Sequence, residues 1–326
     1  MKSNDEKIEN DEFDTEFLSD EVIELFAEPE DSGERIDKYL SGKLPEYSRS
    51  YLKGLIDEGK VRVEGKPAKS SFKVTEGINI SISIPPVKDV EIIPENIPLD
   101  ILYEDEDVIL VNKPKGMVVH PAAGHYTGTL VNALMYHCRD NLSGINGELR
   151  PGIVHRIDMD TTGVIIACKN DVSHRIIAEQ LKEHSIKRKY QAVVYGAFKD
   201  EEGRIEGSIG RSKTDRKKMA VVPDGKPAVT HYRVIRNYTS PNGNNFAHIE
   251  CELETGRTHQ IRVHMTSIGH PLVGDEIYGA AKNPFKLDGQ ALHAEMLGFV
   301  HPRTGEYMEF HAPLPEYFSK LLTKLA

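Results

Sequence analysis

Apolar and polar positions divide the chain into two segments that differ in periodicity. In residues 33–85, apolar side chains first recur at helical spacing and then alternate with polar ones, which predicts two helices followed by a small sheet. The first helix is predicted over 34–44, and the second carries Leu52, Leu55 and Ile56. The strands are predicted at 61–63 and 78–84.

Short apolar runs of strand length dominate the chain from about residue 99 to residue 326. Strands are predicted at 108–112, 164–169, 190–195, 231–236 and 247–253, and helices at 129–138, 173–184 and 260–268. Because strands outnumber helices and do not alternate with them regularly, a doubly wound fold is disfavoured. We expect an α+β protein whose larger domain has a mixed, mostly antiparallel sheet with flanking helices.

Acidic residues are concentrated at the N-terminus. Residues 1–31 hold 13 acidic and two basic side chains, whereas the remainder holds 38 acidic and 39 basic ones. High charge with low hydrophobicity predicts that 1–31 is a disordered acidic tail, with a short helix over 16–26 as the alternative. The expected domains are then a small one at 32–92 and a larger one at 93–326.

Composition argues against several classes of protein. No apolar run approaches the ~18 residues of a membrane span, and the acidic N-terminus does not fit a secretory signal. Cys138, Cys168 and Cys251 are scattered and odd in number, which favours the reducing cytoplasm and no structural zinc. Neither common glycine-rich phosphate loop occurs, so no nucleotide cofactor is expected. No heptad pattern occurs, and we expect a monomer.

Basic residues gather in the small domain. Residues 33–73 contain ten Lys and Arg against six Asp and Glu, and Arg49 and Lys53 fall on its second helix. A basic rim suits the backbone of structured RNA, although an ordinary solvated surface is the alternative. The run ERIDKYL followed by SRSYLKGLIDEGKVRVEGK resembles the S-four-like RNA-binding domain, first named after a ribosomal small-subunit protein. That resemblance implies that Arg49 and Lys53 contact RNA.

The segment HRIDMDTTG, residues 155–163, is the strongest candidate for chemistry. It places Asp158 beside Arg156 on a short loop between two apolar runs. A loop held between buried strands gives the rigid placement that a nucleophilic or charge-stabilising carboxylate needs. The alternative is that Asp158 or Asp160 only satisfies the backbone amides of the turn.

Four further segments combine polar residues with glycine or proline. They are VNKPKG with the following HP (111–121), KRKY (187–190), TGRTHQIR (255–262) and GHPLVGD (269–275). Together with HRIDMDTTG, and in this order, they resemble the motifs of the RluA/RluD family of RNA pseudouridine synthases over nearly the whole larger domain. The S-four-like domain in front makes the large-subunit rRNA pseudouridine synthase D type the nearest resemblance.

This resemblance implies a role for each of three residues. Asp158 matches the catalytic aspartate. Tyr190 matches a tyrosine that stacks on the target base and can take a proton from the sugar; the alternative for Tyr190 is a core aromatic. Arg262 matches the arginine that pairs with the catalytic carboxylate, with Arg257 as its competitor for that role. Breaking a glycosidic bond builds positive charge on the sugar, which a carboxylate stabilises or captures. The reaction requires no cofactor and no metal.

Other basic residues are candidates for RNA contacts. Arg156 resembles an arginine that enters the RNA and helps to flip out the target uridine; the alternative is an arginine paired with a neighbouring acid. Lys187, Arg188 and Lys189 are predicted phosphate contacts, which would position RNA without reading its sequence; the alternative is a charge run that only faces solvent. The remaining polar residues of the motifs are expected to be structural: Lys113, His120, His155 and His259 as loop donors or core histidines, and Asp275 in a turn.

We therefore expect a cytoplasmic, cofactor-free enzyme that isomerises uridine to pseudouridine in structured RNA. Large-subunit rRNA is the first expected substrate and tRNA the second. A non-catalytic RNA-binding factor of ribosome assembly is one rival. A hydrolase that frees uracil is another, and it would need a second carboxylate to activate water, for which Asp160 is the nearest candidate.

Overall fold

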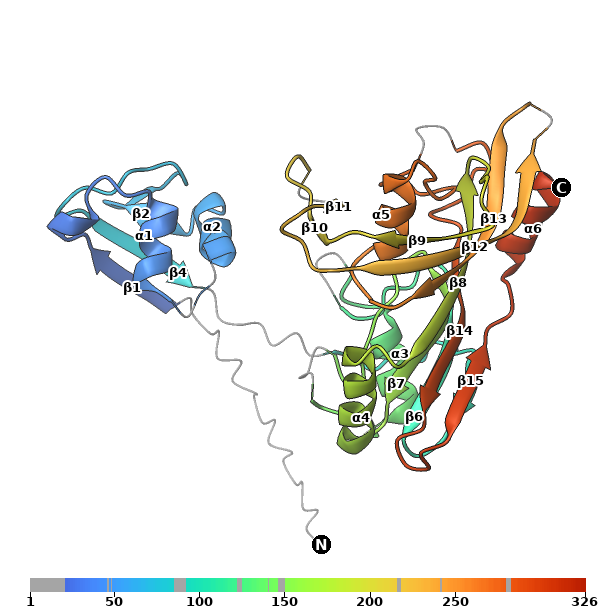
Figure 1. Ribbon diagram of the computed structural model, residues 1–326. Coiled ribbons are helices and arrows are strands. Elements are labelled where there is room, and N and C mark those ends of the chain that lie inside the picture. Colours follow the sequence, from blue (N-terminus) through green and yellow to red (C-terminus); the bar gives the residue numbers. More distant parts are fainter. Residues whose placement is uncertain are drawn as a thin grey trace, which may run out of the picture. The chain divides into compact units, whose positions relative to one another are not determined.

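The computed structural model describes residues 21–45, 47, 49–84, 92–121, 125–139, 141–145, 150–215, 218–240, 242–279 and 283–326. The chain divides into two compact units, residues 1–89 and 90–326. Figure 1 shows the first unit in blue and the second in green to red. No helix among the described residues is long and apolar enough to cross a membrane.

Two helices and a four-stranded antiparallel sheet form the first unit. The strand order is β1-β4-β2-β3. Leu40 and Leu52, one from each helix, are buried in the same apolar cluster as Ile80 and Ile82 of the sheet. The predicted helices and strands are confirmed, with bounds α1 (Ile36–Lys43), α2 (Arg49–Asp57), β2 (Val61–Val63) and β4 (Asn79–Ile84); β1 (Glu21–Phe26), β3 (Lys66–Pro67) and the short η1 (Pro29–Asp31) were not predicted.

The predicted extent of the acidic tail is wrong at its C-terminal end. Residues 21–26 form β1, which pairs antiparallel with β4 along its whole length. Ile23 and Leu25 of β1 pack on the core of the first unit. Their alternation with polar and exposed positions is a strand signal that the acidic composition of the segment obscured. Residues 1–20, the rest of the predicted tail, lie outside the described residues.

A nine-stranded sheet organises the second unit (Figure 1). Its order is β5-β6-β7-β14-β8-β13-β12-β9, with β15 beside β14, and only the pairing of β7 with β14 is parallel. The strands are β5 (Ile101–Glu104), β6 (Val108–Lys113), β7 (Thr162–Cys168), β8 (Lys187–Tyr195), β9 (Glu202–Glu206), β12 (Val229–Thr239), β13 (Asn245–Leu253), β14 (Leu292–Val300) and β15 (Tyr307–His311). A separate hairpin joins β10 (Ile209–Arg211) to β11 (Met219–Val221).

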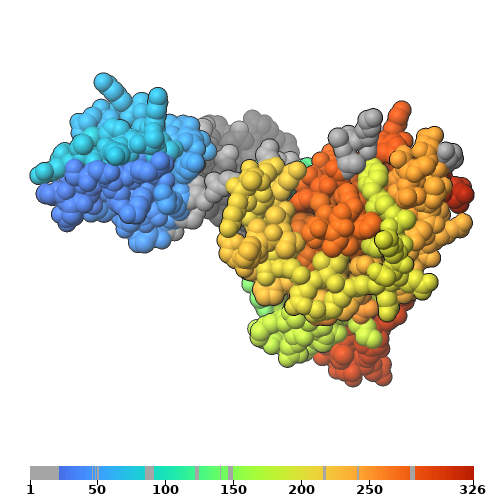
Figure 2. All heavy atoms as spheres, turned by 45° about the horizontal axis from the view of Figure 1, so that its top comes forward, coloured from blue at the N-terminus to red at the C-terminus, as the bar shows by residue number. Residues whose placement is uncertain are grey.

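Helices cover both faces of this sheet. α3 (Leu130–Cys138) and α5 (Gln260–Ser267) bury residues in the cluster that also holds Tyr190 of β8. α4 (Asp171–Lys182) and α6 (Glu316–Leu325) contribute to clusters on the other face. In Figure 2 the orange surface that includes α5 borders the yellow surface that includes β10 and β11, and α5 contacts β11 and β12. The predicted mixed, mostly antiparallel sheet with flanking helices is confirmed.

The strand β14 holds the second unit together. It pairs with β8 along one side, and with β7 and then β15 along the other. At Gly163 the backbone of β14 comes so close that a Cβ would lie 2.1 Å from the carbonyl oxygen of Ala294. The glycine that ends HRIDMDTTG is therefore required by strand packing beside the candidate loop. Ile92, expected in the small domain, packs in the core of the second unit instead.

Candidate active site

The loop that carries Asp158 is fixed on both sides by buried structure. It follows the isolated bridge between Ile153 and Ala167 and leads directly into β7. The amide of Thr161 donates to the carbonyl oxygen of Asp158 at 3.0 Å. His155 accepts from the amide of Ile166 through Nε2 at 3.1 Å, so its ring anchors the loop to the strand. The structural role predicted for His155 is the one that the contacts support.

Lys113 ties the same loop down from the other side. Its side chain is fully buried, and its Nζ donates to the carbonyl oxygens of Pro114, Met117 and Met159, each at 2.8 Å. Met159 directly follows Asp158, so this ammonium holds the backbone beside the carboxylate. Burial lowers the pKa of Lys113 to about 7, against the opposing effect of Asp160 and Asp158.

Arg262 of α5 joins two carboxylates. Its Nη1 donates to Asp158 Oδ2 at 2.8 Å, while Nε and Nη2 donate to Asp275 Oδ2 and Oδ1 at 2.7 and 2.9 Å. Burial would lower the pKa of Arg262, but Asp275 and Asp158 raise it above its usual value. The guanidinium is thus a permanent cation that fixes the rotamer of Asp158. Arg257, the competitor for this role, donates a hydrogen bond from Nε to the carbonyl oxygen of Pro227 instead.

Asp275 does more than the turn role that its sequence suggested. It accepts from the amides of Ile277 and Tyr278, as a turn residue would. Its side chain is also fully buried against Arg262. Burial raises the pKa of this carboxyl, but the hydrogen bonds from Arg262 outweigh it and hold the pKa below the usual range. The sequence signal for this second role was an Asp after an apolar segment, which is too common to identify the partner.

His259 faces the second oxygen of Asp158. Its Nε2 lies 3.8 Å from Asp158 Oδ1, and its Nδ1 is 2.8 Å from the hydroxyl of Tyr278. That hydroxyl accepts from the amide of Met219, so its single hydrogen is free to donate to Nδ1. In the neutral ring the proton then sits on Nε2 and points toward Asp158. Burial lowers the pKa of His259, although the charge of Asp158 opposes this.

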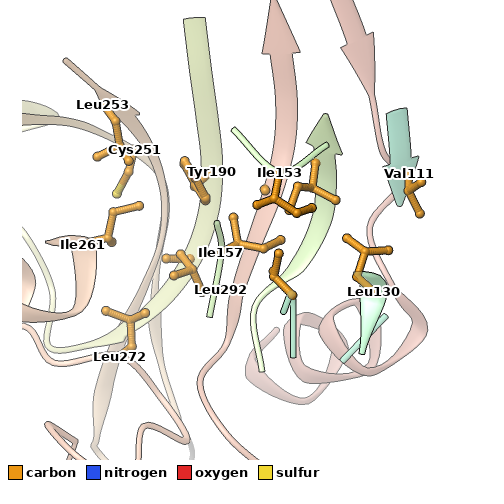
Figure 3. Packing of buried hydrophobic residues seen from close by; sticks show 14 of the residues in the cluster. Val111, Leu130, Ile153, Ile157, Tyr190, Cys251, Leu253, Ile261, Leu272 and Leu292 are labelled. Carbon is orange, nitrogen blue, oxygen red and sulfur yellow. The ribbon is translucent and has the colours of Figure 1, made fainter. Parts of the chain in front are cut away.

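A cavity of about 450 Å³ opens above Asp158. Tyr190 lines it and is only 7% exposed. Figure 3 shows Tyr190 with Ile157 and Leu292, which also line the cavity. Burial raises the pKa of Tyr190, so it is a phenol at neutral pH. An aromatic ring beside aliphatic side chains, in the same cavity as the carboxylate of Asp158, suits a flat base attached to a sugar.

The charged lining of the cavity is strongly basic. Asp158 is its one carboxylate among the described residues, and Arg262 already pairs with it. Four further cations line the cavity: Arg156, Lys182, Arg188 and Arg257. Asp160 does not line it, and so a second carboxylate for water activation is absent from the described lining. Such a cavity attracts a polyanion.

Strand alternation separates the three predicted phosphate contacts of β8. Arg188 lines the cavity with Tyr190. Lys187 and Lys189 line a different hollow on the opposite face, together with Glu250, Glu252, Glu295 and Glu309. Lys189 Nζ lies 3.6 Å from Glu250 Oε1, and Lys187 Nζ lies 5.5 Å from the ring centre of Tyr307. The structure therefore does not bring these two lysines to the cavity.

The predicted RNA contacts of the first unit lie on α2. Arg49 Nη2 donates to Asp37 Oδ2 at 2.7 Å, and Arg35 Nε donates to Asp37 Oδ1 at 2.9 Å. The Arg49 side chain nevertheless remains 54% exposed. Lys53 is exposed. Both cations are therefore accessible, and Arg49 is also part of the fold.

One cluster of potential metal ligands occurs among the described residues, and its own contacts satisfy it. Asp105, Asp107 and His301 lie together away from the cavity. Arg303 Nη2 donates to Asp107 Oδ1 at 3.1 Å, and His301 Nε2 bonds Asp105 Oδ2 at 2.7 Å. An arginine in the place of a cation indicates a structural network.

Known proteins resemble this chain over most of its length. A family model described as RNA pseudouridylate synthase matches residues 107–267, and one described as S4 domain matches residues 34–79. The chain is 50% identical over 303 residues to YlyB of Bacillus subtilis, described as an uncharacterized RNA pseudouridine synthase. That alignment covers 93% of this chain and 98% of the relative. It is 45% identical over 304 residues to the ribosomal large subunit pseudouridine synthase D of Zymomonas mobilis. This alignment covers 90% of this chain and 94% of the relative.

A solved structure shares the fold. Human RNA pseudouridylate synthase domain containing 1 superposes with a TM-score of 0.55 at 25% identity, covering 71% of this chain and 87% of that one. The elements that carry Asp158, Tyr190 and Arg262 lie in the second unit, within the segment matched by the first family model.

Proposed function

The chain belongs to the RNA pseudouridylate synthase family and is an RNA pseudouridine synthase, and we propose that it modifies large-subunit ribosomal RNA with Asp158 as the carboxylate at the reacting sugar. The observation that carries the proposal is the 2.8 Å contact of Asp158 Oδ2 with Arg262, at the wall of a cavity whose other charged groups are basic.

The chemistry needs an anion beside the sugar. The bond between C1′ and N1 breaks, the uracil turns, and C5 bonds to C1′; the hydrogen on C5 leaves to solvent, and N1 is protonated. Positive charge develops at the sugar when the first bond breaks, and Asp158 stabilises or captures it. Arg262 and Lys113 keep the carboxylate in place, so little reorganisation is needed during the reaction.

Tyr190 and Arg156 receive the roles that concern the base. We assign stacking on the flipped uracil to Tyr190, whose ring lines the cavity between aliphatic neighbours. Arg156 is exposed at the rim of the same cavity. Its guanidinium can replace the stacking that the uridine loses when it leaves the RNA.

Support for ribosomal RNA comes from relatives and from charge. Several relatives that match over most of the chain are named ribosomal large subunit pseudouridine synthase D. The S4 domain offers the exposed cations Arg49 and Lys53 for the RNA backbone. Transfer RNA is the alternative substrate.

The test uses rRNA and tRNA transcripts that carry tritium at uracil C5. Isomerisation must release this tritium to water while the base stays attached to the RNA. We expect release from large-subunit rRNA by the wild type, none by Asp158→Asn, and release within about fivefold of wild type by Asp160→Asn, a matched neutralisation outside the cavity. Release from tRNA alone would overturn the substrate assignment. Release by Asp158→Asn at the wild-type rate would overturn the role of Asp158.

We further propose that the enzyme works in the cytoplasm as a monomer. The three cysteines are free and buried, which fits a reducing compartment. Cell fractionation and sedimentation velocity test the two parts separately; recovery in another compartment, or a dimer at micromolar concentration, would contradict them.

A further inference from the structure

Arg188 is a buried cation that no carboxylate among the described residues pairs with. The residue is 6% exposed, and its Nε has no hydrogen-bond partner. Within the described part of the chain, its guanidinium makes a long contact, from Nη2 to the carbonyl oxygen of Glu254 at 3.4 Å. Burial lowers the pKa of Arg188, and the positive charge of Arg257 lowers it further. A buried guanidinium left in this condition destabilises a protein unless something else binds it.

The surrounding backbone is shaped to admit this side chain. A Cβ at Gly256 would lie 2.7 Å from Arg188 Nη1, so any other residue at this position would force the guanidinium to shift. Gly256 directly precedes Arg257, and both residues line the cavity with Arg188. Two arginines, one from a strand and one from a loop, thus line the same cavity, and their like charges repel each other unless an anion lies between them.

The protein does not supply that anion from the described lining. Asp158 is the one carboxylate there, and its Oδ2 is taken by Arg262. Arg188 and Tyr190 are two residues apart on the same face of β8, so their Cα atoms are separated by about 7 Å. This is the scale of the span from a nucleotide base to its own phosphate. A base stacked on Tyr190 would bring its backbone to the two arginines.

We propose that Arg188 and Arg257 form an anion subsite for the phosphodiester adjoining the flipped uridine. This inference rests on the proposed function and names the group that holds the nucleotide after it leaves the RNA stack. The planar fork of a guanidinium matches two oxygens of a phosphate, and its donors are charge-assisted. Neutral uracil would leave the two positive charges uncompensated. Arg188 is a binding residue in this scheme and takes part in no bond change.

The first experiment compares two cations on opposite faces of one strand. RNA affinity is measured at several salt concentrations for wild type, Arg188→Gln and Lys189→Gln, using the rRNA fragment that the wild type modifies or, failing turnover, an rRNA fragment that it binds. We expect Arg188→Gln to weaken binding by roughly 10- to 100-fold and to reduce the salt slope by about one. Lys189→Gln, which removes a cation already facing Glu250, should change affinity by less than about threefold.

Thermal unfolding of the free protein separates binding from structure. Removal of a buried, unpaired charge should leave Tm unchanged or raise it in Arg188→Gln, whereas loss of a structural ion pair would lower it. Gly256→Ala is a second route to the same site, because the added methyl group must displace the Arg188 guanidinium. It should weaken RNA binding in the same direction while leaving the charge of the protein intact.

The second experiment removes the charge from the RNA instead. A methylphosphonate replaces, one at a time, the phosphates on either side of the modified uridine. At one of the two positions, wild type should lose about tenfold in affinity, and Arg188→Gln, which keeps Arg257 at the subsite, should lose clearly less. Equal losses in both proteins, or no loss at either position, would overturn the subsite. These readouts do not require turnover: wild type that fails to bind rRNA contradicts the proposed substrate, whereas intact binding by Arg188→Gln contradicts the subsite alone.

Discussion

Asp275 holds Arg262 by two hydrogen bonds, at 2.7 and 2.9 Å, on the side of the guanidinium that faces away from Asp158. The buried carboxylate thus aims the remaining Nη1 at the carboxylate in the cavity. Asp275 does not itself line the cavity. It can act on the reaction only through other residues, and Arg262 is the one that bonds both Asp275 and Asp158.

Neutralising Asp275 should therefore reduce turnover without changing substrate binding. In Asp275→Asn we expect kcat to fall about 100-fold, because a small displacement of Arg262 misplaces Asp158, while KM stays within about twofold. The free energy of unfolding should fall by about 3 kcal/mol, since a buried ion pair loses one partner. Steady-state tritium release and urea denaturation measure the two effects. A rise in KM with kcat intact would assign Asp275 to binding instead.

The hydroxyl of Tyr190 can be tested apart from its ring. Burial raises the pKa of this phenol, so it remains protonated at neutral pH. Tyr190→Phe keeps the stacking surface, and we expect RNA affinity within about twofold of wild type and a rate lower by roughly 10²-fold, as for loss of one positioned proton-transfer group. The deficit should be constant from about pH 6 to pH 9. A deficit that grows with pH would mean that the phenolate is the active form.

Lys113 should affect activity through the loop that it anchors. In Lys113→Met the carbonyl oxygen of Met159 loses its donor, and the backbone next to Asp158 is no longer fixed. We expect kcat to fall by about 10- to 100-fold. Lys115→Met is the matched control, because Lys115 Nζ lies 4.1 Å from the ring centre of Tyr317 and does not touch Met159. If both variants lose activity equally in single-turnover assays, the anchoring role fails.

Acid should destabilise the folded protein through its buried histidines. Burial lowers the pKa of His248 to about 4, from the model-peptide value near 6.5. Between these two values the unfolded chain binds a proton that the folded protein does not, so stability is lost as pH falls from about 6.5 to about 4 and no further below it. His248→Gln should remove roughly 2–3 kcal/mol of this loss. Urea denaturation at pH 7 and at pH 4.5 measures the difference, and parallel decreases in both proteins would contradict it.

The sequence predicted those elements that depend on residues close together in the chain, and it missed those that depend on distant partners. Strands β6, β7 and β13 were predicted because their apolar runs are recognisable within a few residues. β14 was missed because small and polar residues, such as Ala294 and Gly298, interrupt its apolar positions. Those residues suit three neighbouring strands, which are far away in sequence. The strand propensity of a short stretch of sequence does not show which distant strands will lie beside it.

The site shows the same division between local and distant information. Asp158, Tyr190 and Arg262 were assigned from motifs, and the structure brings all three to one cavity or its wall. The second role of Asp275 depends on a partner 13 residues earlier in a folded helix. The separation of Lys187 and Lys189 from Arg188 follows from strand alternation, which local charge alone had hidden. In the acidic segment 21–26 the local signal was present but overlooked. Its acidic composition obscured the alternation of apolar and polar residues that marks a strand.

The central place of β14 also governs when this enzyme becomes active during its synthesis. β7 follows the Asp158 loop and β8 carries Tyr190, yet these strands are not neighbours, because β14 lies between them. A ribosome that has translated the first 270 residues has made each residue assigned to the reaction but not the strand that joins their supports. We therefore expect the nascent chain to stay inactive until residues 292–300 have emerged and paired with both neighbours. Pairing between strands so distant in sequence is slow relative to local folding, so we expect the active site to be completed late in folding.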